Sequence, residues 1–421
     1  MNIFDWLNVT LMLIFAACCC YQFLYIPISW WKKPKMHKET QLHHYAVLVA
    51  ARNEAPVIEE LIRSIRQQDY PSELVDIYVM ADNCTDDTAA IAEQAGATVY
   101  RRFNHNQIGK GYVLHDLYEK MKEEGRFSEY DGFFVFDADN VLRKNYISEM
   151  NRSFSDGYPV VTGYRNSKNF GDSWVSSGIA LWFLRESRYL NYSRHLIGSS
   201  AAIGGTGFLA ARELIERYDG WNFFTLTEDL EFTSRVVTDG YRIAFCREAE
   251  LYDEQPIDLR TSWRQRMRWT RGYLQTMRKY GKALFLGVFR KDSPQRFACY
   301  DLLMNTIPPI VLGVVGLFLN VGKFFFVMGQ GAAPDELVLP ILQAIGSGYL
   351  MMFLMGALTV ISEWKHIHAA TGKKLLYMLT FPLFMFTYIP ISFAALFVNT
   401  SWKPIAHTVT AQKAGLKMQS H

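Results

Sequence analysis

Two short acidic motifs could support group transfer from an anionic donor. Asp137 and Asp139 stand one residue apart, and carboxylate oxygens bind hard cations such as Mg²⁺ or Mn²⁺. The run Thr227-Glu228-Asp229 offers a carboxylate that could take a proton from an attacking hydroxyl group. Such acids can also simply cap a helix or complement its dipole. We predict a metal site at Asp137 and Asp139 and a general base at Asp229, with Glu228 beside it.

A third motif adds positive charge and an aromatic ring. Gln265, Arg268 and Trp269 stand at positions i, i+3 and i+4 and therefore share one face of a helix. The planar guanidinium of Arg268 suits a diphosphate, and the ring of Trp269 offers a stacking surface for a sugar. The surrounding arginines equally fit an amphipathic helix on lipid headgroups. Both interpretations hold if the inner face of an interfacial helix completes the site.

The helices and strands that must position these residues are predicted to form an α/β domain. Apolar runs with strand character alternate with segments of helical periodicity, which is typical of parallel strands joined by helices in a doubly wound, Rossmann-like sheet. The predicted strands are Tyr45–Ala50, Val75–Met80, Thr98–Tyr100 and Phe133–Phe136, and the predicted helices include Ala55–Gln68 and Tyr112–Met121.

Ligands of such sheets bind beyond the carboxyl ends of the strands. Glu54 and Asp82 follow two of the predicted strands, where they could accept hydrogen bonds from a base and a ribose. Lys110 lies between two glycines, which let the backbone approach a ligand. We predict that Lys110 contacts the phosphate or nucleoside of the donor, and a merely solvated lysine is the equal alternative.

The run Gly204-Gly205-Thr206-Gly207 predicts a loop whose backbone an acceptor can approach. It lacks the spacing of a phosphate-binding P-loop. We assign Gly207, together with Thr227 and Trp269, to acceptor binding.

Four apolar stretches are long enough to cross a bilayer. The first, Val9–Ile28, precedes an aromatic pair and lysines, which indicates that the following segment is cytoplasmic; a signal peptide fits less well because the chain start is not basic. The others are Phe297–Val327, Leu337–Ile361 and Leu375–Val398. Pro382 and Pro390 could break the last stretch into a hairpin that returns the tail to the cytoplasm.

These observations divide the chain into an N-terminal membrane helix (1–31), a cytosolic catalytic domain (40–255), an interfacial segment (256–296), C-terminal membrane helices (297–400) and a tail (401–421). The formal net charge of +3 is too small to indicate nucleic acid as a partner. The six cysteines contain no CxxC pair, so neither a disulfide framework nor a zinc site is predicted.

The combined motifs resemble the membrane-bound processive branch of the family 2 glycosyltransferases, which includes cellulose, chitin, hyaluronan and poly-N-acetylglucosamine synthases. The D, DxD, TED and QxxRW signature of that branch is matched by Asp82, Asp137 with Asp139, Thr227 to Asp229, and Gln265 to Trp269. The resemblance extends from about Trp30 to Val398.

This resemblance implies a cytosolic GT-A domain, inversion of configuration, a UDP-sugar donor, a divalent metal and a channel for a growing polymer. It also implies that Glu54 and Asp82 contact the uridine, Lys110 the nucleotide and Asp139 the metal. Asp229 would be the base, and Trp269 would hold the acceptor sugar. The chain has fewer candidate spans than cellulose synthases, so a homodimer or an accessory subunit could complete a channel. The segment Trp402-Lys403-Pro404-Ile405 fits either a remnant of a closing segment or a plain tail.

We therefore expect an inverting β-glycosyltransferase in the plasma membrane. It would be a processive polysaccharide synthase that polymerises a hexose, with UDP-glucose favoured as donor over UDP-N-acetylglucosamine. Its partners would be that donor, a growing polysaccharide or glycolipid, and the bilayer. Non-processive transfer to a membrane lipid is the main alternative, and a receptor or scaffold with an inactive transferase fold is another. A transporter ranks last because the spans carry few charges.

Overall fold

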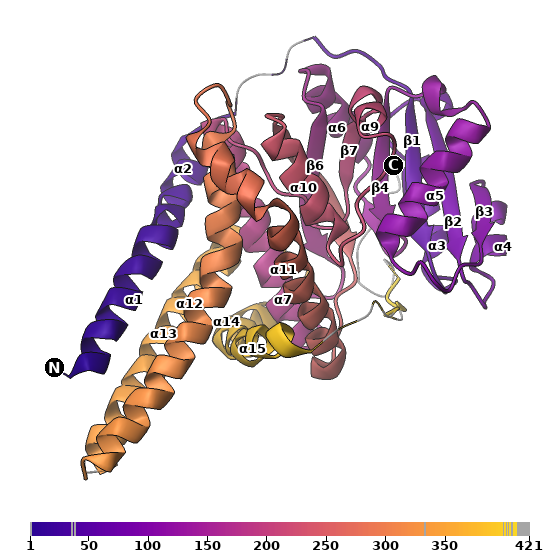
Figure 1. Cartoon of the computed structure of the whole chain (residues 1–421). Helices are drawn as coiled ribbons and strands as arrows, with labels where there is room; N and C mark the ends of the chain where they lie inside the picture. Colours follow the sequence, from indigo (N-terminus) through magenta and orange to yellow (C-terminus); the bar gives the residue numbers. More distant parts are fainter. Residues whose placement is uncertain are drawn as a thin grey trace.

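The structure is a computed structural model that describes residues 2–34, 37, 39–331, 334–398, 400, 402, 404–405 and 407–410. An α/β domain forms one part, and long helices project from it to one side (Figure 1). Lys403 and residues 411–421 of the expected tail lie outside the described residues.

One mixed sheet organises the α/β domain, with the strand order β3-β2-β1-β4-β7-β6-β8-β5. Strands β3, β2, β1 and β4 are parallel, whereas β7 is antiparallel to both of its neighbours. The strands are β1 (Tyr45–Ala51), β2 (Val75–Asp82), β3 (Thr98–Arg102), β4 (Gly132–Asp137), β5 (Val141–Leu142), β6 (Val160–Ser167), β7 (Phe208–Ala211) and β8 (Ile243–Asp253).

Helices cover both faces of this sheet because successive strand residues point to opposite sides. On one side, Ala46 and Leu48 of β1 pack in a core with helices α5, α7, α9 and α10. On the other, Val47 and Val49 pack with α3, α4 and α6. These helices are α3 (Ile58–Arg66), α4 (Thr88–Gln94), α5 (Lys110–Glu123), α6 (Tyr146–Ser155), α7 (Trp174–Arg185), α9 (Arg212–Arg217) and α10 (Glu228–Thr238).

The predicted doubly wound region is confirmed by the parallel strands β1 to β4, each of which contains a predicted strand. The second half of the sheet goes beyond the prediction. Its antiparallel strand β7 has only four residues and directly follows the glycine loop. A run this short shows no clear hydrophobic alternation, so the sequence does not predict it as a strand.

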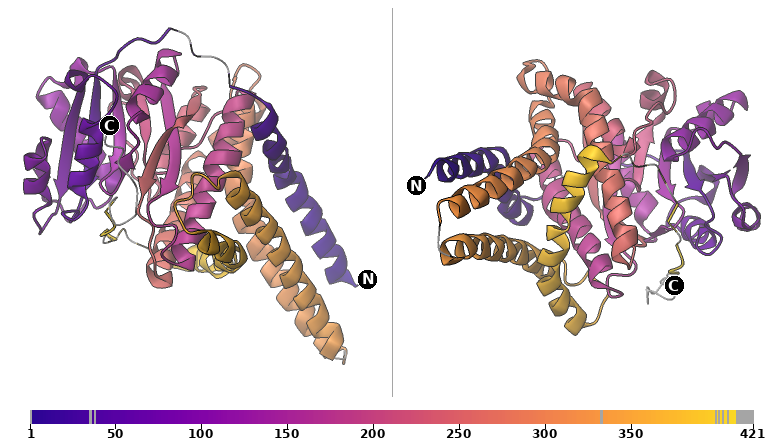
Figure 2. Two further views of the ribbon diagram at one scale, coloured as in Figure 1. Left: turned by 180° about the vertical axis from the view of Figure 1, so that it is seen from behind. Right: turned by 60° about the horizontal axis from the view of Figure 1, so that its bottom comes forward.

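Four segments of the described chain are long and apolar enough to cross a membrane: Ile3–Trp31, Arg296–Gly329, Val338–Ser362 and Thr371–Phe397. The first contains α1 (Ile3–Cys19) and α2 (Tyr25–Trp31), and the next two belong to α12 (Arg296–Gly329) and α13 (Pro334–Ser362). Figures 1 and 2 show α1, α12 and α13 leaving the α/β domain in a common direction.

Like the first segment, the fourth is broken into two α-helices, α14 (Thr371–Phe386) and α15 (Tyr388–Phe397). Both short helices run across the direction of the long ones (Figure 2). Helix α14 packs against α7, and α15 packs against α11 (Leu259–Phe289). The break falls at Thr387, because Pro390 lacks an N–H group and its ring conflicts with the carbonyl group four residues earlier, at Phe386. Pro382 is accommodated inside α14. The chain after α15 returns to the α/β domain, the side expected for the tail.

A buried ion pair joins the α/β domain to the projecting helices. Arg194 of α8 (Tyr192–Ile197) pairs with Asp301 of α12, and both side chains are almost fully buried. The hydroxyl group of Tyr21, between α1 and α2, also donates a hydrogen bond to Asp301. One carboxylate thus connects three parts of the chain that are far apart in sequence.

We predict that Asp301→Ala lowers the free energy of unfolding by about 3–5 kcal/mol, because Arg194 would be left buried without its carboxylate. Thermal and denaturant unfolding of the detergent-solubilised protein would measure this loss. Arg63→Ala is the control, since it removes an exposed pair with Glu59 and should cost less than about 1 kcal/mol. Equal losses in the two variants would contradict the assignment.

Candidate active site

All the predicted site residues except Gly207 line one cavity of about 280 Å³. It opens beyond the carboxyl ends of the parallel strands, where a doubly wound sheet binds its ligands. The predicted residues that line it are Glu54, Asp82, Lys110, Asp137, Asp139, Thr227, Glu228, Asp229, Gln265, Arg268 and Trp269.

Gly207 has a different role from the predicted one. Its backbone lies in the left-handed region, at φ +65°, and a Cβ atom built on it would lie only 2.0 Å from the side chain of Leu251. Gly207 therefore allows tight packing beneath the cavity. Its neighbours Gly204 and Gly205 are the loop residues that line the cavity.

The first aspartate of the signature is oriented by an arginine from the edge strand. Arg102 Nη1 donates a hydrogen bond to Asp82 Oδ1 at 2.7 Å, and both side chains are buried. Asn83 Nδ2 donates a second bond to the same oxygen at 2.9 Å. Asp82 is thus held rigidly at the rim of the cavity, with its other carboxylate oxygen 4.0 Å from Arg52.

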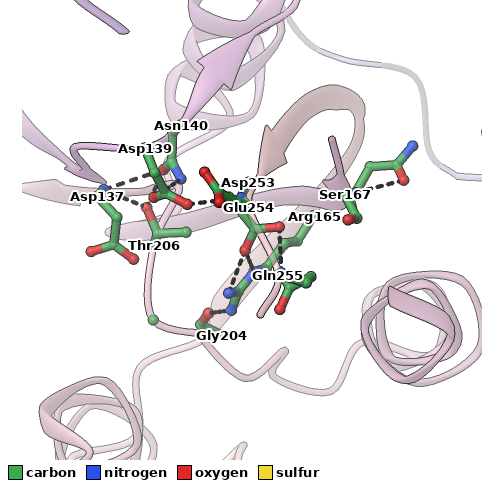
Figure 3. A network of polar contacts seen from close by, with 12 residues as sticks. Asp137, Asp139, Asn140, Arg165, Ser167, Gly204, Thr206, Asp253, Glu254 and Gln255 are labelled. Carbon is green, nitrogen blue, oxygen red and sulfur yellow. Dashed lines mark hydrogen bonds and ion pairs between the residues drawn. The ribbon is translucent and has the colours of Figure 1, made fainter. Parts of the chain in front are cut away.

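The two aspartates after β4 do not converge on one point. Asp137 accepts a hydrogen bond from Lys110 Nζ at 2.5 Å, and the same nitrogen donates to the carbonyl oxygen of Gly205 at 2.8 Å. Asp139 turns the other way and accepts a hydrogen bond from the backbone N–H of Glu254 at 2.8 Å (Figure 3). The expectation that both carboxylates face one cation is not met in this arrangement.

The donor set still fits a divalent cation. Among the described residues there is no group of three or more His, Cys, Asp or Glu side chains that could hold a metal. Mg²⁺ and Mn²⁺ are often bound by only one or two carboxylates, with substrate phosphates and water completing the shell. Asp139, at the cavity wall, meets that requirement.

A half-buried arginine that sequence analysis did not single out holds the glycine loop. Arg165 Nε donates to Asp253 Oδ2 at 2.6 Å, and its Nη1 donates to the carbonyl oxygen of Gly204 (Figure 3). Its guanidinium lies 3.6 Å from the ring centre of Phe183. Arg165 follows no predicted strand and belongs to no motif, so only its position in the fold identifies it as a site residue.

The candidate base lies at the start of α10, opposite the glycine loop. Burial raises the pKa of Glu228 to about 7, and the neighbouring Asp229 adds to this effect. Burial also raises the pKa of Asp229, although the backbone N–H of Leu230 and the charge of Lys110 oppose the shift. A Cβ atom built on Gly205 would lie 3.7 Å from the Asp229 carboxylate, so this acid faces the glycine loop.

Helix α11 brings the QxxRW residues to the same cavity. Arg268 Nη1 donates a hydrogen bond to the carbonyl oxygen of Leu226 at 2.9 Å, just before the base. The Trp269 ring packs edge-on against Phe183, with ring centres 5.8 Å apart, and also lines the cavity. The close approach of α11 depends on Gly272, where a Cβ atom would lie 2.6 Å from Thr227 Oγ1. The helix thus has the inner face that the sequence predicted.

Part of the C-terminal segment forms a wall of the cavity. Trp402, Pro404, Ile405 and His407 line the cavity, and His407 Nδ1 lies 3.0 Å from both carboxylate oxygens of Glu54. This position favours the closing segment over the plain tail. Trp402 lies over the guanidinium of Arg52, 5.5 Å from its ring centre. The visible signal in the sequence was a tryptophan and a histidine after the last apolar stretch.

Charge explains why this histidine fits there. Burial alone would lower the pKa of His407, but Asp139, Glu54 and Glu254 outweigh it and raise the pKa to about 10. Burial raises the pKa of Glu54 to about 7, against the opposing effect of His407. A protonated His407 thus supplies positive charge among these carboxylates.

Residues 43–272, from the start of the sheet into α11, match the sequence model of a family described as "Glycosyltransferase like family 2". The chain belongs to glycosyltransferase family 2. The matched region holds every predicted site residue, so the family assignment and the cavity identify the same part of the protein.

Relatives of this family 2 glycosyltransferase include proteins that are named for different activities. A probable glycosyltransferase, YdaM, from Bacillus subtilis is 27% identical over 57% of this chain and 57% of its own length. A β-monoglucosyldiacylglycerol synthase from Synechocystis is 26% identical over 56% of this chain and 48% of its own. A poly-β-1,6-N-acetyl-D-glucosamine synthase from Staphylococcus aureus is 23% identical over 66% of this chain and 65% of its own. The chain thus spans about half to two thirds of these curated relatives.

The GT-A fold is supported by a solved structure. A mannosyltransferase from Pyrobaculum calidifontis, in complex with GDP-Man and Mn²⁺, superposes with a TM-score of 0.58 at 16% identity, covering 94% of this chain and 99% of that one. This similarity establishes the fold of the transferase: a GT-A-like α/β domain with helices apolar enough to span a membrane.

We predict that the transfer rate of this glycosyltransferase falls as pH drops through about 7. A raised pKa keeps a carboxyl group protonated at higher pH, and a protonated acid cannot accept the proton of the attacking hydroxyl. The apparent pKa of kcat/KM would belong to the Glu228 and Asp229 pair. Initial rates between about pH 5 and about pH 9 would measure it, after checking that activity recovers on return to neutral pH. A rate that stays level down to about pH 5 would indicate an ordinary carboxyl group instead.

Proposed function

We propose that this protein is a membrane-embedded, inverting β-glycosyltransferase that moves a hexose from a UDP-sugar to a hydroxyl group. The observation that carries this proposal is the convergence of Asp139, Asp229 and Trp269 on a single cavity. Each of these side chains comes from a different element, and their shared cavity accommodates a donor, a base and an acceptor.

The donor end of the cavity suits a nucleoside diphosphate. Glu54 and Asp82 lie at the rim for the uridine and ribose, and Lys110 and Arg268 supply positive charge for the diphosphate. Gln265, on the same helix face as Arg268, would complete that contact. A Mg²⁺ or Mn²⁺ ion at Asp139 would neutralise charge that develops on the leaving diphosphate. With the ion at Asp139, Asp137 would stay paired with Lys110, whose ammonium group also binds the carbonyl oxygen of Gly205 and so holds the glycine loop.

The acceptor end suits an attack from the side opposite the diphosphate. Asp229 would take the proton of the attacking hydroxyl, with Glu228 raising its proton affinity through charge repulsion. One displacement with the base on the far side inverts the anomeric configuration. Trp269 and Thr227 would hold the acceptor in line.

Processive synthesis of a polysaccharide is our first candidate for the overall reaction, with UDP-glucose as donor and UDP-N-acetylglucosamine next. The similar synthase from Staphylococcus aureus is named for a polymer of N-acetylglucosamine. A homodimer or an accessory subunit could complete a path for the polymer. The second candidate is single transfer to a lipid, because the cavity also reaches Leu302, Asn305 and Thr306 of the projecting helix α12, and similar synthases are named for glucosyldiacylglycerol.

The proposed location is the plasma membrane, with the α/β domain in the cytoplasm. Lysines follow α2 and lie in the first turn of α14, where Lys373 donates a hydrogen bond to the carbonyl oxygen of Gly171. By the positive-inside rule, such lysines support a cytoplasmic position for these helix ends. Cytoplasmic UDP-sugars would then reach the cavity directly.

The purified protein in lipid nanodiscs, incubated in turn with labelled UDP-glucose, UDP-N-acetylglucosamine and GDP-mannose, tests the proposed function. We expect UDP release and a labelled product with one UDP-sugar in the presence of Mg²⁺ or Mn²⁺. Asp229→Asn should reduce transfer at least about 100-fold, while UDP affinity changes little because the base does not contact the nucleotide. Release from GDP-mannose alone, or a fully active Asp229→Asn variant, would contradict the proposal.

We also predict that Trp269→Ala impairs transfer to the acceptor by about tenfold or more, because stacking on a sugar is lost. Donor hydrolysis in the absence of acceptor should be nearly unchanged. Comparing labelled product with free UDP measures the two reactions separately. Trp31→Ala is the control, since that residue is highly exposed and does not line the cavity. An equal loss of both reactions in Trp269→Ala would argue against acceptor stacking.

A further inference from the structure

A carboxylate that belongs to no recognised motif lies in the wall of the same cavity. Glu186 lines the cavity and makes no hydrogen bond or ion pair with any of the described residues. Its chain neighbours are engaged differently: the Ser187 hydroxyl contacts Arg165, and Arg188 pairs with Glu363 at 3.1 Å. The carboxylate of Glu186 is thus available to a ligand in the cavity.

The local backbone is unusual at this point. Glu186 begins a π-helical segment, Glu186–Asn191, between α7 and α8. Such segments are rare and are frequently found at functional sites. Here the segment is held firmly by the buried pair of Arg194 and Asp301 just beyond it. The position of Glu186 is therefore rigidly set by the fold.

The surroundings of Glu186 define the acceptor end of the cavity. Four aromatic side chains line this part, and aromatic rings pack on the faces of sugars and on aliphatic chains alike. They are Trp182, Phe183, Trp269 and Tyr273. Thr227 also lines the cavity and is only 4% exposed, and its hydroxyl oxygen lies against Gly272 of α11.

Two carboxylates, those of Glu186 and Asp229, line this end of the cavity. Glu186 and Asp229 are close enough to interact electrostatically, and burial raises the pKa of each. Of the arginines whose charge acts on Glu186, Arg194 and Arg165 are paired with Asp301 and Asp253, and Arg185 donates a hydrogen bond to Gln22. A phosphate in this position would meet two carboxylates, whereas hydroxyl groups could donate hydrogen bonds to them.

We propose that the acceptor is an uncharged polyol, a sugar or a glycerol headgroup, and that Glu186 orients it by accepting a hydrogen bond from a hydroxyl next to the attacking one. Asp229 then receives the proton of the attacking hydroxyl. The same carboxylate excludes acceptors that carry a phosphate. This inference rests on the proposed function and narrows its acceptor class for both candidate reactions.

Binding without turnover tests this directly. The full-length protein in nanodiscs is titrated with octyl β-glucoside below its micelle-forming concentration and, separately, with citronellyl phosphate, and quenching of tryptophan fluorescence is followed. We expect the neutral glycoside to bind and the phosphate to bind at least about tenfold more weakly. Glu186→Gln should weaken glycoside binding about tenfold, since a hydrogen bond to a charged group is lost. Glu186→Lys should invert the preference between the two ligands.

Measurements of turnover distinguish a failure of this proposal from a failure of the proposed function. In Glu186→Gln the KM for the acceptor should rise while UDP release without acceptor stays within about twofold of the wild type. Glu248→Gln, an exposed acid on β8 outside the cavity, is the matched control and should change nothing, and equal unfolding temperatures would exclude a folding defect. Unchanged glycoside binding in Glu186→Gln, or preferred binding of the phosphate by the wild type, would overturn the proposal even if UDP release is normal. Absence of UDP release from every donor would instead overturn the proposed function.

Discussion

Negative charge concentrated in one partly buried cavity is the constraint on which the rest of the structure depends. Unpaired carboxylates in such a place would repel one another and lose hydration, so each needs a cation or a donor. The structure supplies these from separate elements: Lys110 for Asp137, Arg165 for Asp253 and His407 for Glu54. The cavity is therefore stable only when α5, β6 and the C-terminal segment are all in place.

The same principle connects the catalytic domain to its membrane helices. The pair of Arg194 and Asp301 joins α8 to α12, and Arg188 pairs with Glu363 at the end of α13. Because these charges are buried, separating the domain from the helices would leave them unpaired at high cost. The π-helical segment Glu186–Asn191 contains Arg188 and ends just before Arg194, so these two pairs tie the geometry of the acceptor end to the projecting helices.

The break at Thr387 also contributes to this connection between the α/β domain and the helices. Arg266 of α11 donates a hydrogen bond to Thr387 at 2.6 Å, which fastens the crosswise helices α14 and α15 to the helix that carries Trp269. Exposed leucines on α14 face away from the domain. Such a surface suits the level of lipid headgroups, where an amphiphilic acceptor would have to approach.

The sequence by itself determined the fold class, the parallel half of the sheet and most members of the site. These are local signals: strand runs such as that ending at Asp137, and helix spacing such as that of Gln265, Arg268 and Trp269, depend on neighbouring residues alone. Pro390 likewise predicted the break in the last apolar stretch. Only the tertiary structure decided that Asp137 and Asp139 diverge, that Gly207 packs beneath the cavity, and that Arg165, Glu186 and His407 belong to the site. The reason is physical: which charges neutralise one another depends on distances between elements hundreds of residues apart, such as Glu54 and His407, and no local pattern records those distances.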